Sequence, residues 1–192
     1  VTDFNGCIVY ASELIDEPDS SILNSPIVNN VGCNGECNGS IDVIVLGGVA
    51  PYNFLWNDPN TQNTSLASSL CIGNYELTIT DQNGCIVTLI DSIIEPDPLI
   101  VTIDNIVDAY CKESLDGAVD ITISGGSPIY TIEWVSQTNE IFNDEDLLNV
   151  LPGNYYLTVI DQNDCTVLDS VEIDTTVIVK AFAGLDTSLC YG

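Results

Sequence analysis

Cysteine is the residue type with the clearest chemical role in this chain. The 192-residue sequence contains eight cysteines but no histidine and no methionine. Without histidine the commonest general base is missing, and no cysteine has the cationic neighbours that stabilise a thiolate. The lack of histidine also disfavours a zinc site at the Cys33-x3-Cys37 spacing. We therefore expect structural disulfides, an extracellular location and no enzymatic activity.

Acidic residues dominate the charge. There are 29 aspartates and glutamates against two basic residues, Lys112 and Lys180, for a net charge of −27. Nucleic-acid binding requires cationic contacts to phosphates, so this composition argues against it and against docking on anionic lipid surfaces. No apolar run is long enough to span a bilayer, and we expect no membrane insertion. The carboxylates fall mainly in expected turns and on exposed strand faces, which predicts no glycosidase-like pair.

The elements that would position the cysteines come from an internal repeat. Residues 153–165 (GNYYLTVIDQNDC) repeat residues 73–85 (GNYELTITDQNGC) at an offset of 80, and residues 1–7 match 79–85 at an offset of 78. Such a period indicates a tandem array in which each unit is one structural domain. The expected order is the end of a preceding module at 1–18, a first repeat at 19–97, a second repeat at 98–174 and the start of a following module at 175–192.

Each repeat is expected to be all-β. Short runs rich in valine, isoleucine, threonine and tyrosine are separated by glycine, proline, asparagine and aspartate, and no long segment has helical periodicity. Trp56 and Trp134 lie on expected central strands, and Tyr75 and Tyr155 begin a later strand as in a tyrosine corner. These features favour tandem immunoglobulin-like β-sandwiches. Because the joint at 95–97 is short and contains proline, we expect an elongated, stiff rod.

The repeat also predicts how the cysteines pair. Cys37 and Cys71 are replaced together in the second repeat by Leu115 and Leu151, which indicates a Cys37–Cys71 disulfide. The cysteines shared by both repeats are expected to pair within each repeat. The expected pairs are Cys33–Cys85 and Cys111–Cys165. A bridge between neighbouring repeats, such as Cys33–Cys165, stays open, because Cys33 and Cys85 would lie toward opposite ends of a standard sandwich.

A second candidate site is the turn before the last strand. Asp81 with Asn83, and Asp161 with Asn163, offer hard oxygen ligands at the same place in both repeats, which is compatible with calcium. Aspartate and asparagine are also good turn formers without any ligand. No other cofactor is expected.

The combined motifs resemble a known repeat. The stretches CNGECNGSIDVIVLGGVAPYNFLW (33–56) and LCIGNYELTITDQNGC (70–85), with their second copies, resemble the SprB repeat of Bacteroidota cell-surface adhesins. The resemblance implies a segment of a very long gliding-motility adhesin exported by the type IX system. With a bacterial source of this kind, Ser92, Ser170 and Thr175 are candidate acceptors of O-glycosylation, because each follows an aspartate in a triplet that resembles the D-[ST]-apolar acceptor motif of Bacteroidota.

The expected function is mechanical. The segment would act as a stiff, disulfide-stabilised spacer whose partners are neighbouring repeats, while surface or polysaccharide ligands would bind at the level of the array. The alternative is a ligand- or polysaccharide-binding accessory module of a secreted protein. Exposed loop aromatics would favour that alternative, whereas Tyr52, Trp56 and Tyr75 are expected in the core.

Overall fold

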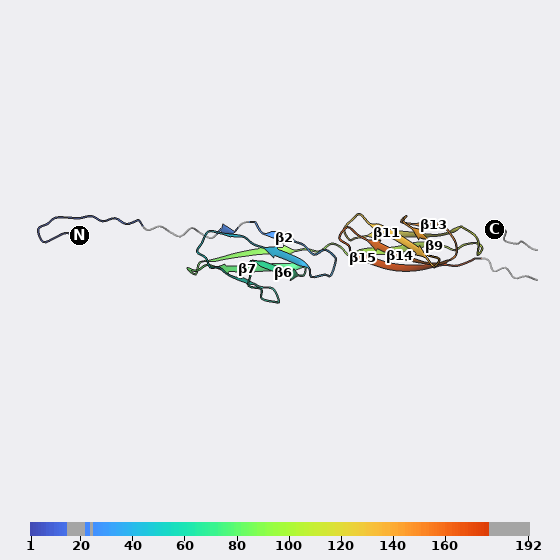
Figure 1. Ribbon diagram of the computed structural model, residues 1–192, viewed down its shortest axis with the longest axis horizontal. Coiled ribbons are helices and arrows are strands. Elements are labelled where there is room, and N and C mark those ends of the chain that lie inside the picture. The colour runs from blue at the N-terminus through green and yellow to red at the C-terminus, as the bar shows by residue number, and fades with distance from the viewer. Residues whose placement is uncertain (15–21, 24, 177–192) are drawn as a thin grey trace, which may run out of the picture. The chain divides into compact units, whose positions relative to one another are not determined.

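The computed structural model describes residues 1–14, 22–23 and 25–176. Across these ranges the chain forms strands and turns and no helix, so the expected all-β class is confirmed (Figure 1). The described part accordingly contains no helix that is long and apolar enough to cross a membrane.

Alternation of apolar and polar residues explains the long strands. In β7 (Gly73–Thr80), Tyr75, Leu77 and Ile79 are buried while the residues between them are not. The matching strand β14 (Gly153–Ile160) repeats this pattern. Successive side chains of a strand point to opposite faces, so each strand presents one apolar face to a core.

The second repeat forms two antiparallel sheets. One has the order β13-β10-β9 and the other β12-β11-β14-β15. Their bounds are β9 Ile100–Val107, β10 Gly117–Ser124, β11 Thr131–Ser136, β12 Ile141–Phe142, β13 Leu147–Val150, β14 Gly153–Ile160 and β15 Thr166–Ile173. In immunoglobulin lettering these are sheets A-B-E and C′-C-F-G, an immunoglobulin-like sandwich. Figure 1 shows β9, β11, β13, β14 and β15 gathered in one body.

The first repeat has the corresponding strands in sheets of order β2-β3-β6 and β5-β7-β8, and β1 pairs with β4. The bounds are β1 Ile22–Leu23, β2 Ile27–Asn29, β3 Gly39–Asp42, β4 Val45–Leu46, β5 Asn53–Trp56, β6 Leu66–Leu70, β7 Gly73–Thr80 and β8 Ile86–Ile93. Each of the long antiparallel strands has its counterpart in the second repeat, as the sequence offset requires.

A tryptophan lies in the core of each repeat. Trp56 and Trp134 are 1% and 0% exposed. Each indole still donates a hydrogen bond, from Trp56 Nε1 to Thr64 O at 2.9 Å and from Trp134 Nε1 to Glu145 O at 3.2 Å. Tyr155 is also buried, and its hydroxyl donates to Leu151 O at 2.7 Å, which is the hydrogen bond of a tyrosine corner. Burial of these aromatics is therefore not opposed by an unpaired polar atom.

The chain divides into two compact units that do not follow the repeats. The first unit contains residues 1–28, 41–67 and 74–91, and the second contains 29–40, 68–73 and 92–192. Two loops of the first repeat, 29–40 and 68–73, thus belong to the unit that holds the whole second repeat. The contacts made by these loops define the candidate site.

Candidate functional site

A cysteine-containing turn occurs three times, at residues 3–7, 81–85 and 161–165. In each turn the backbone N–H of the aspartate donates to the cysteine carbonyl at 3.0 Å. The aspartate Oδ1 accepts the N–H groups two and four residues later. These distances are 2.9 and 2.8 Å at Asp3, 2.9 and 2.8 Å at Asp81, and 2.8 and 2.9 Å at Asp161. The side chain thus holds the cysteine backbone in one geometry in all three copies.

The residue before each cysteine has a left-handed backbone. The φ angles are 83° at Gly6, 82° at Gly84 and 65° at Asp164. Glycine adopts this region without steric cost, and aspartate is among the few other residues that tolerate it. The change from glycine to aspartate between the repeats therefore preserves the turn.

The second carboxylate oxygen ties the turn to a preceding loop. Asp81 Oδ2 accepts Val49 N–H at 3.0 Å, and Asp161 Oδ2 accepts Ser127 N–H at 2.7 Å. The hydrogen bond from Val49 is the main reason that the pKa of Asp81 is lowered. Burial tends to raise the pKa of Asp161, but the hydrogen bonds from Ser127 and the turn amides outweigh it and the pKa is lowered. Hydrogen bonds to the ionised form stabilise the carboxylate.

This geometry gives the candidate calcium ligands Asp81 and Asp161 a structural role within the turn. Both oxygens of Asp81 and of Asp161 accept N–H groups, and a carboxylate surrounded by N–H donors faces partial positive charge. The amide Nδ2 of Asn163 donates to Gly32 O at 3.0 Å and to Ser127 Oγ at 2.8 Å. Asn83, its counterpart, is exposed. Among the described residues, no group of three or more carboxylates and cysteines is arranged to hold a metal ion.

The turn at 161–165 is bonded to the loop that contains Cys33. Cys33 and Cys165 form a disulfide across 132 residues of sequence, with a Cα–Cα distance of 5.6 Å. Both cysteines belong to the second compact unit, and the hydrogen bond from Asn163 to Gly32 lies beside the bridge. A covalent bond and a side-chain hydrogen bond therefore join the second repeat to a loop of the first.

The loop around Cys33 is itself fixed to the end of the first repeat. Gly35 N–H donates to Glu95 Oε2 at 2.8 Å, and Asn34 Nδ2 donates to Pro96 O at 3.0 Å. Glu36 N–H donates to Cys33 O at 3.2 Å, which closes a turn at the cysteine. Cys33 is therefore held by the chain segment that leads into the second repeat.

This bridge corrects the expected pairings Cys33–Cys85 and Cys111–Cys165. Cys33 lies near the C-terminal end of β8, because Val31 N–H donates to Ile94 O at 3.1 Å. Cys85 immediately precedes the N-terminal end of the same eight-residue strand. At about 3.3 Å per residue the strand separates the two positions by roughly 25 Å, whereas a disulfide needs Cα atoms within about 7 Å. Cys85 is a free, exposed thiol, as is Cys7.

The other bridge is Cys37–Cys71, the pair whose joint replacement in the second repeat pointed to it. Cys111, the counterpart of Cys33, is also disulfide-bonded. In the second repeat Leu115 and Leu151 line one shallow pocket with Val150 and Tyr155. A pair of apolar side chains thus occupies the place that the disulfide has in the first repeat.

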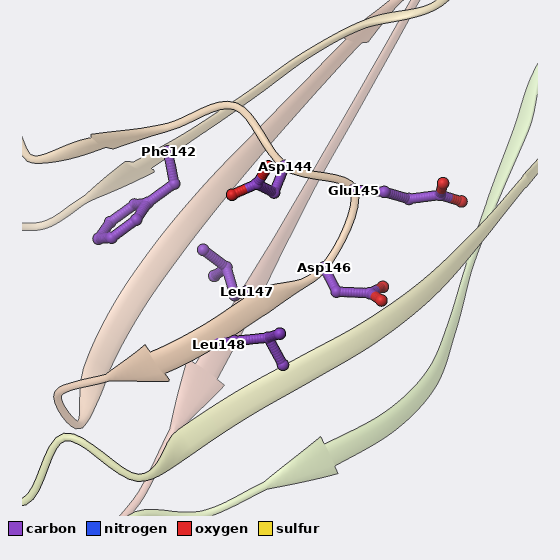
Figure 2. A pocket seen from close by; sticks show the side chains of 6 residues that line it. All are labelled: Phe142, Asp144, Glu145, Asp146, Leu147 and Leu148. Carbon is purple, nitrogen blue, oxygen red and sulfur yellow. The ribbon is translucent and has the colours of Figure 1, made fainter.

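An acidic loop borders another pocket of the second repeat. The pocket has a volume of about 330 Å³ and is lined by Phe142, Asp144, Glu145, Asp146, Leu147 and Leu148. Figure 2 shows that the carboxylates of Asp144 and Glu145 point away from each other. Asp146 Oδ1 accepts Ile121 N–H at 3.0 Å, and its charge, with a smaller effect of Asp104, raises the pKa of Asp120. These carboxylates do not converge on one ligand position.

The comparison with protein families agrees with the repeat. The SprB repeat family matches residues 25–61 and residues 103–139, two segments 78 residues apart. The chain carries two SprB repeats. The matched segments include Cys33 and Cys111, the cysteines at the start of each repeat. No curated protein is significantly similar to the chain.

Solved structures similar to the two SprB repeats include tandem immunoglobulin domains. The N-terminal eight Ig domains of Down Syndrome Cell Adhesion Molecule match at 14% identity and a TM-score of 0.44, over 83% of this chain and 25% of that chain. DIP-gamma IG1+IG2 matches at 13% identity and a TM-score of 0.38, over 81% and 97%. The amphioxus IgVJ-C2 molecule matches at 12% identity and a TM-score of 0.35, over 83% and 99%. All three TM-scores are below 0.5, so these matches carry no conclusion about what this chain does.

The predicted glycosylation residues lie at the ends of the SprB repeats. Ser92 on β8 and Ser170 on β15 are exposed, and Thr175, after β15, is partly exposed. Their modification stays a prediction. Of the aromatics considered for ligand binding, Trp56 and Tyr75 are buried, and the Tyr52 hydroxyl donates to Gly47 O at 2.6 Å.

The sequence favoured pairing within each repeat but left the Cys33–Cys165 bridge open, and that alternative is the one the structure contains. The reason for leaving it open holds in the structure: Cys85 precedes β8, while Val31 and Asn34, on either side of Cys33, contact the residues after β8, so pairing within the repeat would have to span a whole strand. The sequence named Asn163 only as a candidate cation ligand and did not predict that its amide contacts Gly32. Asparagine in the first turn offers the same amide, but only the second turn has a Cys33 loop to meet within the described chain.

Proposed function

We propose that the chain is a structural repeat segment of a secreted cell-surface adhesin, in which SprB repeats form a stiff, disulfide-linked spacer. The observation that supports this proposal most strongly is the match to the SprB repeat family at two places one period apart. The wider setting, gliding motility and surface attachment after type IX export, follows from the resemblance and is part of this proposal.

The Cys33–Cys165 bridge supports the spacer role. When the chain is pulled from residues on either side of the two cysteines, the covalent bond carries the load and the segment between them, a separation of 132 residues, cannot extend. These positions include the Cys37–Cys71 bridge and all the strands from β3 to β14. Tension therefore does not act along most strands of either core, which is useful for a segment whose task is to transmit force.

The charge supports a solvent-exposed location. The net charge of −27 gives strong mutual repulsion between arrays, which favours solubility and disfavours collapse. Disulfides persist in oxidising surroundings outside the cytosol. Both features fit a surface protein whose repeats remain separate from one another.

Single-molecule stretching of the full chain from its two ends tests the spacer. An extended chain spans at most about 3.5 Å per residue, so breaking the Cys33–Cys165 bridge should release roughly 450 Å of additional extension. We expect this gain when a reducing agent is added, and a smaller gain in a Cys33→Ser variant without reductant, because the Cys37–Cys71 bridge still closes a separation of 34 residues. Equal extension of the oxidised and reduced chains would contradict the spacer role.

Labelling of intact cells tests the adhesin. Antibodies raised against this chain should bind unpermeabilised cells of the source bacterium, and brief protease treatment of those cells should remove the signal. Blocking with Fab fragments should reduce attachment to glass. Labelling that requires permeabilised cells would contradict the surface location, whatever the stretching result.

A further inference from the structure

We propose that Cys85 forms a disulfide with the Cys33 counterpart of another SprB repeat preceding it, so that successive repeats are linked by overlapping covalent loops. The partner is thus a second copy of this module, bound through the cysteine in its 32–37 loop. The proposal concerns how repeats are joined and holds whether or not the array adheres to a surface.

The first argument is that the turns present their cysteines in the same way. At 81–85 and at 161–165 the same four backbone contacts form: two amides on Oδ1, the aspartate amide on the cysteine carbonyl, and the following turn contact to the aspartate carbonyl. The last of these is 3.0 Å from Gly84 N to Asp81 O and 3.1 Å from Asp164 N to Asp161 O. A loop able to meet Cys165 can therefore meet Cys85.

The second argument is the environment of the two cysteines. Cys165 is partly buried where it meets the Cys33 loop, whereas Cys85 is exposed and its thiol is free. Asn163 uses its amide on Gly32 O, and Asn83, the equivalent residue, is exposed. The first turn thus retains the bonding cysteine and the asparagine that contacts the incoming loop, with neither covered by the described residues.

The third argument comes from Cys33, the cysteine that pairs with the turn cysteine. Cys33 is bonded to the turn of the repeat that follows it, not to its own repeat. Cys111, at the same place in the second repeat, is also disulfide-bonded. Ser114 N–H donates to Cys111 O at 3.0 Å, just as Glu36 N–H donates to Cys33 O, so the two cysteines lie in the same kind of turn. The loop cysteine is therefore bonded in both repeats, while the turn cysteine is bonded only where a preceding repeat is described in full.

The chemistry is a thiol–disulfide exchange. The two thiols lose their protons and together two electrons as the new S–S bond forms. The oxidant is a protein or small-molecule disulfide, whose own S–S bond is broken and which leaves as two thiols. In a refolding experiment glutathione disulfide supplies this oxidant.

The consequence is a chain of interlocked loops. The bridge from Cys33 to Cys165 encloses Cys111, and in an array where Cys111 bonds to the turn of the next repeat, that loop would enclose Cys165. Each loop thus overlaps the next. Breaking the Cys33–Cys165 bridge in such an array would release only the stretch between Cys85 and Cys111, because the preceding and following loops still close the rest.

A chain with an inserted repeat tests the proposal. A copy of residues 19–96 is placed before residue 19 of the full chain. The junction is native, because Glu17-Pro18-Asp19 recurs as Glu95-Pro96-Asp97. After refolding with glutathione disulfide, the thiols are counted with a chromogenic disulfide reagent in denaturant, and bridges are mapped after peptic digestion at acid pH. We expect the inserted Cys33 to pair with Cys85 of the original copy.

Two matched variants separate the alternatives. Suppose that each Cys33 pairs with the turn cysteine of the following repeat. Cys85→Ser in the inserted copy then removes a free cysteine and lowers the thiol count by one. Cys85→Ser in the original copy leaves the inserted Cys33 without its partner and raises the thiol count by one. Pairing within a repeat predicts the opposite signs. That opposite result would overturn the proposal, as would an inserted Cys33 and an original Cys85 that both remain free.

Discussion

The two SprB repeats share a fold but differ at one corner of it, the place where the loop before β3 meets the end of β6 in the first repeat. In the first repeat, Cys37 and Cys71 are covalently joined between the loop before β3 and the end of β6. In the second repeat, Leu115 and Leu151 line a shallow pocket at the matching positions and are 62% and 37% exposed. The disulfide acts mainly on the unfolded chain, whereas the leucines contribute only the apolar area they remove from water.

The comparison shows which contacts the fold requires and which it can exchange. Both repeats keep the buried tryptophan, the aspartate turn and its cysteine. Only the corner bridge is exchanged. The bond that the turn cysteine of the second repeat makes to Cys33 joins two repeats, so an apolar pair within one repeat could not replace it.

The largest expected effect comes from removing the corner bridge. Cys37→Ser with Cys71→Ser should lower the free energy of unfolding of the first repeat by about 4 kcal/mol, the chain-entropy value for a closed loop of this length. Urea unfolding followed by tryptophan fluorescence measures it, because each repeat contains one tryptophan. In a Trp134→Phe background, Trp56 reports the first repeat alone.

The matched control is Leu115→Ala with Leu151→Ala in a Trp56→Phe background, where Trp134 reports the second repeat. Partly exposed leucines should cost only about 1 kcal/mol together. Equal losses in the two experiments would show that the disulfide contributes no more than the leucine pair, and the contrast drawn between the repeats would fail.

A smaller loss is expected at the turn that both repeats share. Asp161→Ala leaves the amides of Ser127, Asn163 and Cys165 without their acceptor, and the lost charge-assisted bonds should cost about 3 kcal/mol in the second repeat. Asp81→Ala should destabilise the first repeat in the same direction. Urea midpoints read from Trp134 and Trp56 provide the test, and an unchanged midpoint at Asp161 would show that the turn does not depend on its carboxylate.

The same turns set a dependence on pH. The folded pKa values of Asp81 and Asp161 are lowered, so their contribution is fully present above the unfolded value near 3.9 and is lost as pH falls through the folded pKa. We expect melting temperatures to be level at neutral pH and to fall below about pH 4. The slope should be shallower in Asp161→Asn, and an unaltered slope in that variant would assign the acid sensitivity to other carboxylates.

Adding a bridge to the second repeat should produce a gain. Leu115→Cys with Leu151→Cys introduces into the second repeat a disulfide at the place of Cys37–Cys71. We expect a stabilisation of about 2 kcal/mol, because introduced disulfides usually stabilise less than the chain-entropy model predicts. Non-reducing mass spectrometry confirms the bond, and the urea midpoint of Trp134 gives the gain. A formed bond that leaves the midpoint unchanged would mean that the corner of the second repeat is not ordered as in the first.

The sequence predicts the fold well because strand patterning is local. Tyr75, Leu77 and Ile79 alternate inward, and the same pattern at Tyr155 fixes the second copy. It predicts Cys37–Cys71 because two cysteines disappear together. It could not assign Cys165 to Cys33, since that bond depends on which loops meet across 132 residues, and a repeated sequence presents equivalent cysteines in every copy.

The smallest expected effect distinguishes the two turns themselves. Gly84 and Asp164 occupy the same left-handed position, with φ of 82° and 65°. Asp164→Gly should stabilise the second repeat by roughly 0.5–1 kcal/mol, because glycine relieves the left-handed conformation, although part of the gain is offset by the entropy of the unfolded chain. Gly84→Asp has open space for the new side chain, since no atom lies within 4 Å of a Cβ built there, and its cost should come from the backbone alone.

The two substitutions should therefore change the urea midpoints of Trp134 and Trp56 by similar amounts with opposite sign. A large loss in Gly84→Asp with no gain in Asp164→Gly would show that the first turn is held more tightly than its hydrogen bonds indicate.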